Sequence, residues 1–298
     1  MPTFPNFAYE TVARQDGSGE LAYKVLPGPA NGGSIPFVMI TGLAASGLVD
    51  WFPMVEYLSK FRTILVMDNR GIGRSSSKDE ETPLTVTQHV KDIDQLVRLV
   101  GWKEIDLLGF SMGGSIVQGV LAEGLLGSMD LSFKVRRVIL ASTAARFSSE
   151  LGLDSHPEWD ALFKPSPDPE ERVAVAKQLI QEDYDPAFCE DSANQPLLGK
   201  RAVEYGYVSR PGGVVREQLR MAHGSSFLDM LPKIPESIGV LSLHGSLDQT
   251  VSQEHQLRII SSIKHAQSLT FPCGHSWFDY FGEEHWAQVI GNFLDGVA

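Results

Sequence analysis

One serine of the chain has the sequence surroundings of a nucleophile. Ser111 lies in the segment Gly-Phe-Ser-Met-Gly-Gly at residues 109–114, directly after the apolar run 105–108 and at the start of a stretch with helical periodicity. A G-x-S-x-G pattern between a strand and a helix favours a sharp turn whose small flanking residues leave the hydroxyl exposed. A tight turn without chemistry would use the same glycines. The context favours Ser111 as a nucleophile.

A serine hydroxyl needs a base, and the base needs a carboxylate that orients it. Asp248 follows the apolar run 240–243, and His275 follows the run 267–271. The end of the run 135–140 is another place for the acid, but it reads Ala-Ser-Thr at residues 141–143 and offers no carboxylate. Asp248 could instead be a solvated residue that caps a turn. We predict a Ser111–His275–Asp248 triad.

In this order of nucleophile, acid and base, the chain resembles the α/β-hydrolase superfamily, in particular its small cap-bearing serine hydrolases. Residues 68–75, Asp-Asn-Arg-Gly-Ile-Gly-Arg-Ser, are similar to the D-x-R-G-x-G-x-S turn after the fourth strand of that family, a structural landmark. The resemblance covers nearly the whole chain. It implies an α/β fold with a mostly parallel sheet flanked by helices and a helical cap inserted after the sixth strand.

The resemblance also implies where an oxyanion hole lies. Its donors would be the backbone N–H groups of Met112, beside the nucleophile, and of Leu43 in the loop after residues 37–40. The chain has Thr41-Gly42 where the common pattern has His-Gly. The backbone donor does not depend on that side chain, but the imidazole that often steadies the loop is missing. An oxyanion hole of altered geometry therefore remains an alternative.

The elements that would position these residues can be read from apolar runs and periodicity. Short runs rich in Val, Ile and Leu, typical of strands covered on both faces, occupy residues 37–40, 63–67, 105–108, 135–140, 240–243 and 267–271. Periodic apolar residues predict helices that end at Gly101, begin at Ser111 and span residues 283–293. Alternation of strands and helices predicts an open α/β sheet with right-handed crossovers.

This alternation stops between Ser142 and Pro235, where no convincing strand occurs. The segment has too many large apolar side chains for a disordered linker, which favours an ordered helical insertion. We therefore predict a hydrolase core of residues 1–141 and 236–298 and a helical cap of residues 142–235. For the substrate pocket we expect contributions from Trp159 and Phe163 in the cap, and from Phe110 and Trp277 beside the triad.

Composition restricts the partners. The chain has 37 acidic and 25 basic residues and a net charge of −12, so a nucleic acid or an anionic membrane would be repelled. Neither partner is expected. The two cysteines form no disulfide framework or metal motif, and the N-terminus lacks the features of a signal peptide, which predicts a reduced, cytoplasmic location. The expected partner is a small-molecule substrate, and a homodimer is left open.

Other reactive residues have simpler interpretations. His244 is expected to pack beside the acid loop, with a second base as the alternative. The remaining histidines show no H-E-x-x-H or other metal-ligand spacing, and the chain has neither a complete dinucleotide loop nor a P-loop. No metal or cofactor is expected. Cys273 is a rival nucleophile by position, but a buried thiol at a strand end is the favoured interpretation.

Together these residues predict a cofactor-free serine hydrolase that forms an acyl-enzyme with a small, largely apolar ester or lactone. The same triad could cleave a carbon–carbon bond, hydrolyse a thioester or act as a lyase, because fold and triad do not determine the substrate. A low-turnover ligand receptor is the alternative outside enzymes.

Overall fold

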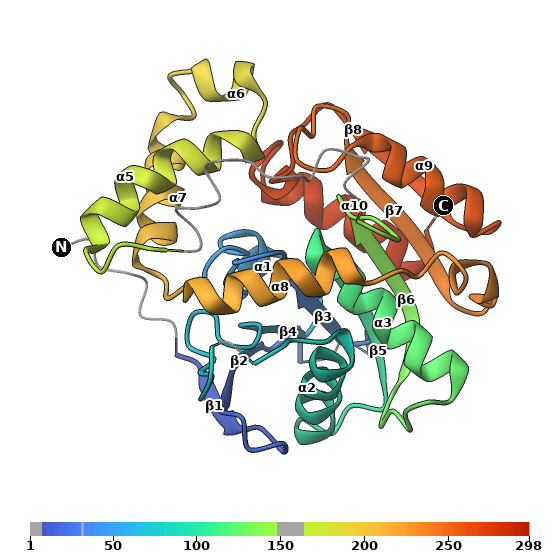
Figure 1. Cartoon of the computed structure of the whole chain (residues 1–298). Helices are drawn as coiled ribbons and strands as arrows, with labels where there is room; N and C mark the ends of the chain where they lie inside the picture. Colours follow the sequence, from blue (N-terminus) through green and yellow to red (C-terminus); the bar gives the residue numbers. More distant parts are fainter. Residues whose placement is uncertain (1–7, 31–32, 81, 148–163, 298) are drawn as a thin grey trace.

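The computed structural model describes residues 8–30, 33–80, 82–147 and 164–297, and it contains one sheet of eight strands. Figure 1 shows the chain traced through this sheet and the surrounding helices. The strands are β1 (Glu10–Ala13), β2 (Glu20–Leu26), β3 (Phe37–Ile40), β4 (Ile64–Met67), β5 (Glu104–Phe110), β6 (Lys134–Ala141), β7 (Gly239–Gly245) and β8 (Gln267–Phe271).

The sheet is antiparallel at one edge and parallel elsewhere. The strand order is β1-β2-β4-β3-β5-β6-β7-β8. The β1/β2 and β2/β4 pairs are antiparallel, and every pair from β4 to β8 is parallel. The carboxyl ends of β3, β5, β7 and β8 therefore lie along one edge, where ligands bind in open α/β sheets.

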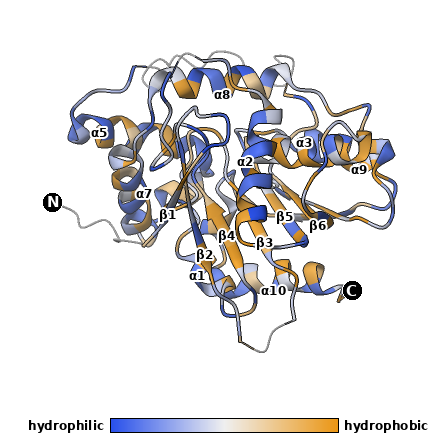
Figure 2. Ribbon diagram, turned by 90° about the horizontal axis from the view of Figure 1, so that it is seen from below, coloured by the Kyte–Doolittle hydropathy of each residue, from blue (hydrophilic) through white to orange (hydrophobic). Residues whose placement is uncertain are grey.

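Two layers of helices cover the sheet, as Figure 2 shows from below. The helices α2 (Val86–Leu99), α3 (Met112–Leu126) and α9 (Gln253–Ser262) pack on one face, and α1 (Met54–Leu58) and α10 (Glu283–Asp295) on the other. Strand side chains alternate between the faces: Val38 and Ile40 join the first core, Phe37 and Met39 the second. The expected α/β class, with a mostly parallel sheet flanked by helices, is confirmed.

The six predicted strand runs correspond to β3 to β8, with boundaries that differ by at most two residues. The sequence analysis does not predict β1 and β2. β1 is largely exposed, and β2 carries the charged residues Glu20 and Lys24, so neither has the continuous apolar run of a buried parallel strand. Across the described ranges, no helix is both long and apolar enough to cross a membrane.

Helices fill the described part of the chain between β6 and β7. They are α5 (Pro169–Leu179), α6 (Pro186–Glu190), α7 (Gln195–Tyr207) and α8 (Gly212–Gly224), with the 3₁₀ helices η2 (Ile180–Asp183) and η3 (Leu231–Lys233). In Figure 1, α5, α6 and α7 gather at one side of the molecule, and α8 leads back across the sheet towards β7. The predicted pocket residues Trp159 and Phe163 lie outside the described residues.

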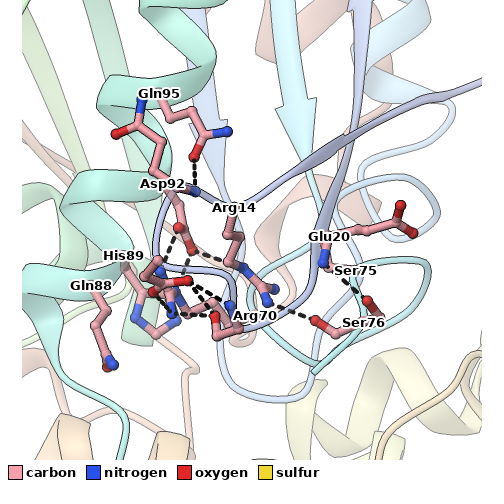
Figure 3. Close-up of polar contacts among 12 residues, drawn as sticks. Arg14, Glu20, Arg70, Ser75, Ser76, Gln88, His89, Asp92 and Gln95 are labelled. Atoms are coloured by element: carbon pink, nitrogen blue, oxygen red, sulfur yellow. Dashed lines mark hydrogen bonds and ion pairs between the residues drawn. The ribbon is translucent and has the colours of Figure 1, made fainter. Parts of the chain in front are cut away.

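The D-x-R-G-x-G-x-S segment is part of a buried ionic network (Figure 3). Arg70 contacts Asp92 of α2 through Nε at 2.5 Å and Nη2 at 2.7 Å, and its Nη1 lies 2.8 Å from Asp16. Arg14, at the end of β1, lies 3.6 Å from the same Asp92 carboxylate. The network thus connects the N-terminal hairpin to α2.

Candidate active site

Ser111 lies at the turn between β5 and α3. Its backbone has φ 54° and ψ −124°, a conformation that non-glycine residues rarely adopt. The Ser111 N–H donates to the Ala141 carbonyl at 3.0 Å, and the Thr143 hydroxyl donates to the Ser111 carbonyl at 2.6 Å. Bonds to β6 and to the residues after it therefore hold the strained turn from both sides.

The neighbouring glycines are required by close backbone approach. A Cβ atom at Gly109 would lie 2.4 Å from the Gly113 carbonyl oxygen, and one at Gly113 would lie 2.4 Å from the Ile40 carbonyl oxygen. A Cβ atom at Gly42 would lie 3.0 Å from the Ser111 Cβ. The turn therefore packs directly against the loop after β3, which brings Leu43 and Ser111 to one site.

Asp248 and His275 meet beyond the ends of β7 and β8. Oδ2 of Asp248 lies 2.8 Å from Nδ1 of His275. Oδ1 accepts hydrogen bonds from the Thr250 N–H at 2.9 Å and the Val251 N–H at 2.8 Å. These two bonds fix the carboxylate, so that its second oxygen orients the imidazole and leaves Nε2 directed elsewhere.

The electrostatics of this pair suit a base. Burial alone lowers the pKa of His275, but the charge and hydrogen bond of Asp248, with a smaller contribution from Asp183, outweigh it and leave the pKa raised. For Asp248, burial raises the pKa, but the His275 partner dominates and the net pKa is lowered. The carboxylate is therefore ionised at neutral pH, and the imidazole is stabilised when it takes a proton.

The two predicted oxyanion donors lie beside Ser111. Leu43 and Met112 line the same pocket as the serine. The next N–H groups of the loop are occupied, since Ala44 donates to the Gln218 side chain at 2.9 Å and Ala45 to the Gly42 carbonyl at 3.4 Å. For the N–H groups of Leu43 and Met112, no acceptor is found in the part of the chain that the structure describes.

Thr41 supplies part of what a histidine would supply to this loop. Its hydroxyl donates to the Ala45 carbonyl at 3.1 Å, across the turn that contains Leu43. The Asn69 side-chain amide, in the segment after β4, donates to the Thr41 carbonyl at 3.2 Å. Both hydrogen bonds are buried or partly buried, so the loop has an internal brace without an imidazole.

A cavity of about 190 Å³ opens at this edge of the sheet. The core contributes Ser111, His275, Phe110 and Trp51 to its wall, and Phe110 lies with its ring centroid 4.8 Å from that of His275. The segment between β6 and β7 contributes Leu179, Ile180, Glu182, Asp183, Tyr184, Arg201, Tyr205, Leu219, Ala222 and His223. The wall is largely apolar but carries several ionisable groups.

Buried polar contacts join this segment to the His275 loop. The Arg201 guanidinium makes a two-point contact with Asp279, at 2.9 and 2.5 Å, and the Tyr184 hydroxyl donates to the same carboxylate at 2.6 Å. The Tyr280 hydroxyl donates to Asp185 at 2.8 Å. The position of this part of the pocket wall is thus determined relative to the histidine.

The structure revises one predicted pocket residue. Trp277 is fully buried and packs on Trp286 and Trp51 behind the site, so it belongs to the core and does not line the cavity. It follows His275 in sequence, but the start of the 3₁₀ helix η4 (Trp277–Asp279) turns its side chain into the apolar interior. Phe110, in contrast, lines the cavity.

The rival residues occupy structural positions. Nε2 of His244 lies 2.9 Å from the Val251 carbonyl and 3.7 Å from Asp248, and burial lowers its pKa, so it is a neutral neighbour of the acid loop. Cys273 is buried, and burial raises its pKa to about 12. A thiol with that pKa stays protonated at neutral pH and is a poor nucleophile.

Sequence reasoning missed several residues of the pocket wall, among them Asp50, Asp183 and Leu219. They belong to no motif, and their place depends on how distant helices and loops meet. As for metals, a search of the described ranges finds no group of three or more His, Cys, Asp or Glu side chains that could hold an ion.

Comparison with known proteins agrees with this architecture. The family model for the α/β hydrolase fold matches residues 35–167. The structure is similar to an esterase from a Rhodococcus species, with a TM-score of 0.78, 18% identity, and coverage of 98% of this chain and 100% of that one.

Two further structures show the range of chemistry on this fold. An enol-lactonase from Burkholderia xenovorans gives a TM-score of 0.75 at 19% identity, covering 96% of this chain and 100% of that one. A meta-cleavage product hydrolase from Pseudomonas fluorescens gives a TM-score of 0.73 at 19% identity, covering 97% of this chain and 98% of that one. No curated protein matches the chain in sequence.

Proposed function

We propose that this chain, which has the α/β-hydrolase fold, is a serine hydrolase of small carboxylic esters or lactones, with Ser111, His275 and Asp248 as its triad. The observation that carries the proposal is the convergence of three features on one cavity. These are the strained turn at Ser111, the 2.8 Å contact between Asp248 and His275, and the N–H groups of Leu43 and Met112.

The first half of the reaction forms an acyl-enzyme. Nε2 of His275 accepts the proton of the Ser111 hydroxyl while Oγ attacks the substrate carbonyl. The oxyanion of the tetrahedral intermediate accepts hydrogen bonds from the Leu43 and Met112 N–H groups, whose directions are set by the loop and by the start of α3. Asp248 holds the proton on Nδ1 and stabilises the imidazolium. The imidazolium then protonates the leaving alcohol.

The second half repeats these roles with water. His275 takes a proton from a water molecule that attacks the acyl carbonyl, the same N–H groups hold the oxyanion, and Ser111 leaves with the proton. No further group is needed, because the acid, base and oxyanion donors serve both halves.

The small volume and largely apolar wall of the cavity support a compact substrate. Neighbouring structures named as an esterase and an enol-lactonase support an ester or lactone carbonyl as the reacting group. Cleavage of a carbon–carbon bond on the same triad is the second candidate, supported by the likeness to the meta-cleavage product hydrolase.

The test is steady-state turnover of a panel of short nitrophenyl esters, γ- and δ-lactones, thioesters and a vinylogous diketone by wild type and Ser111→Ala. We expect ester or lactone hydrolysis in wild type, and a loss of at least about 10³ in kcat in the variant with unchanged circular dichroism. Ser261→Ala, an exposed serine of α9, is the matched control. Equal turnover by wild type and Ser111→Ala would refute the proposal.

A further inference from the structure

The pocket wall contains a carboxylate that the proposed mechanism does not use. Asp183, the last residue of η2, lines the cavity together with Ser111 and His275. It comes from the helical segment between β6 and β7, whereas the triad comes from the core. Its place in the wall beside His275 suits a role in binding the substrate.

Backbone contacts on both sides determine the position of Asp183. Its carbonyl accepts a hydrogen bond from the Ser276 N–H at 3.0 Å, one residue after the histidine. The preceding carbonyl, of Glu182, accepts from the Thr250 hydroxyl at 3.1 Å in the Asp248 loop. Asp183 is thus anchored to the loops of both other triad residues without using its carboxylate.

The cations near this wall are already paired. Arg201 contacts Asp279 and Glu204, and Arg210 lies 3.6 Å from Asp50. For the Asp183 carboxylate, the part of the chain that the structure describes provides neither an ion pair nor a hydrogen bond.

The charged groups that act most strongly on Asp183, besides His275, are acidic. They are Glu182, Asp50 and Asp248, and His275 is uncharged when it acts as a base. Burial raises the pKa of Asp183 to about 6, with His275 opposing that change, so the carboxylate is still ionised at neutral pH. An ionised carboxylate in a partly enclosed cavity is costly unless a ligand supplies the opposite charge.

We propose that Asp183 is a specificity-determining residue that binds a cationic group of the substrate, so that the pocket prefers esters with an ammonium group near the carbonyl. This inference rests on the proposed hydrolase function. It refines the expected neutral, apolar substrate: the apolar wall surrounds the body of the substrate, and Asp183 attracts its positive end.

Two esters of nearly equal shape test the proposal. Acetylcholine carries a trimethylammonium group, and 3,3-dimethylbutyl acetate carries an uncharged tert-butyl group in its place. We expect wild type to have a kcat/KM at least about tenfold higher for the cationic ester than for the neutral one, and Asp183→Asn to lower this ratio about tenfold. Asp130→Asn, which removes an exposed charge outside the pocket, should keep the wild-type ratio.

The outcomes separate this inference from the proposed function. If both esters are hydrolysed with the same ratio in wild type and Asp183→Asn, or if wild type prefers the neutral ester, the inference is wrong and the hydrolase function stands. A role of Asp183 only in raising the basicity of His275 would lower both rates equally, which also overturns it.

If neither ester is hydrolysed, binding of choline decides. Calorimetric titration of wild type and Asp183→Asn should then give at least tenfold weaker binding in the variant, and equal or absent binding would overturn the inference. If Asp183→Asn does not fold, the wild-type preference between the two esters is the deciding measurement.

Discussion

The core and the segment between β6 and β7 contribute to the same pocket in different ways. Each core contribution lies just beyond a parallel strand: Leu43 after β3, Ser111 after β5, Asp248 after β7 and His275 after β8. The other segment contributes side chains from helices with no common register, such as Asp183 and Leu219. The backbone at the strand ends is fixed by the sheet, which suits the groups that take part in the reaction. The helix side chains, in contrast, can be substituted without moving those groups. We therefore expect changes at the strand ends to affect kcat for every substrate, and changes in the segment between β6 and β7 to affect the choice among substrates.

The largest expected effect in the core, after loss of the nucleophile, is that of Asp248→Asn. The amide cannot stabilise the imidazolium and favours the wrong tautomer of His275, so kcat should fall by about 10³–10⁴ for all esters alike. Ester turnover and thermal unfolding measure activity and fold, with Asp130→Asn as the control. A loss of kcat for only some of the esters would mean that Asp248 also affects substrate selection.

A structural core residue should behave differently. Arg70→Ala leaves the Asp92 carboxylate buried with only Arg14 nearby, which should lower the free energy of unfolding by about 3–5 kcal/mol. The activity of the folded fraction should not change, because neither Arg70 nor its partners Asp92 and Arg14 line the cavity that contains Ser111 and His275. Denaturant unfolding measures the loss. Arg98→Ala removes the exposed pair with Asp94 and should cost under about 1 kcal/mol. A selective loss of kcat in Arg70→Ala would make the segment catalytic.

The pH dependence of activity tests the roles of His275 and Asp248. His275 acts as a base only when neutral, and its pKa is raised above the ordinary value of about 6.5. Activity should therefore be full above the raised pKa and fall about tenfold per pH unit below it. In Asp248→Asn this limb should move to lower pH, because the raising carboxylate is gone. A profile that is flat from about pH 5 to 8 would exclude a histidine base.

The smallest effect is expected in the part of the pocket wall that comes from the segment between β6 and β7. Leu219→Ala enlarges the cavity. The ratio of kcat/KM between acetate and hexanoate esters should therefore change by a factor equivalent to about 1–3 kcal/mol. Rates across an acyl-length series measure it, and Leu126→Ala, at the exposed end of α3, is the control. An equal loss of kcat/KM for every acyl length would contradict a role of Leu219 in substrate selection.

Sequence alone predicts the parts that depend on local constraints. Ser111 stands out because its glycines are required by the strained turn, and Asp248 because it follows the buried apolar strand β7. The run before His275 is a strand, as predicted, but β8 lies at the edge of the sheet and is largely exposed, not covered on both faces. Trp277 packs in the core although it follows His275 closely, because adjacency in sequence does not reveal the direction of a side chain in η4. No sequence motif identifies Asp183 as a pocket residue, because its position depends on a hydrogen bond to Ser276, far away in the sequence. β1 is an exposed edge strand and has no apolar run. β2 lies between β1 and β4 and is mostly buried, but its charged residues Glu20 and Lys24 interrupt the apolar pattern.

The central claim is that Ser111 is an activated nucleophile, and covalent labelling tests it most directly. Wild-type protein is treated with a small fluorophosphonate and mapped by peptide mass spectrometry, with Asp248→Asn treated in parallel. We predict one adduct per chain, on the peptide that contains Ser111, formed far more slowly in Asp248→Asn. No adduct, or an adduct on another residue at an unchanged rate in Asp248→Asn, would contradict it.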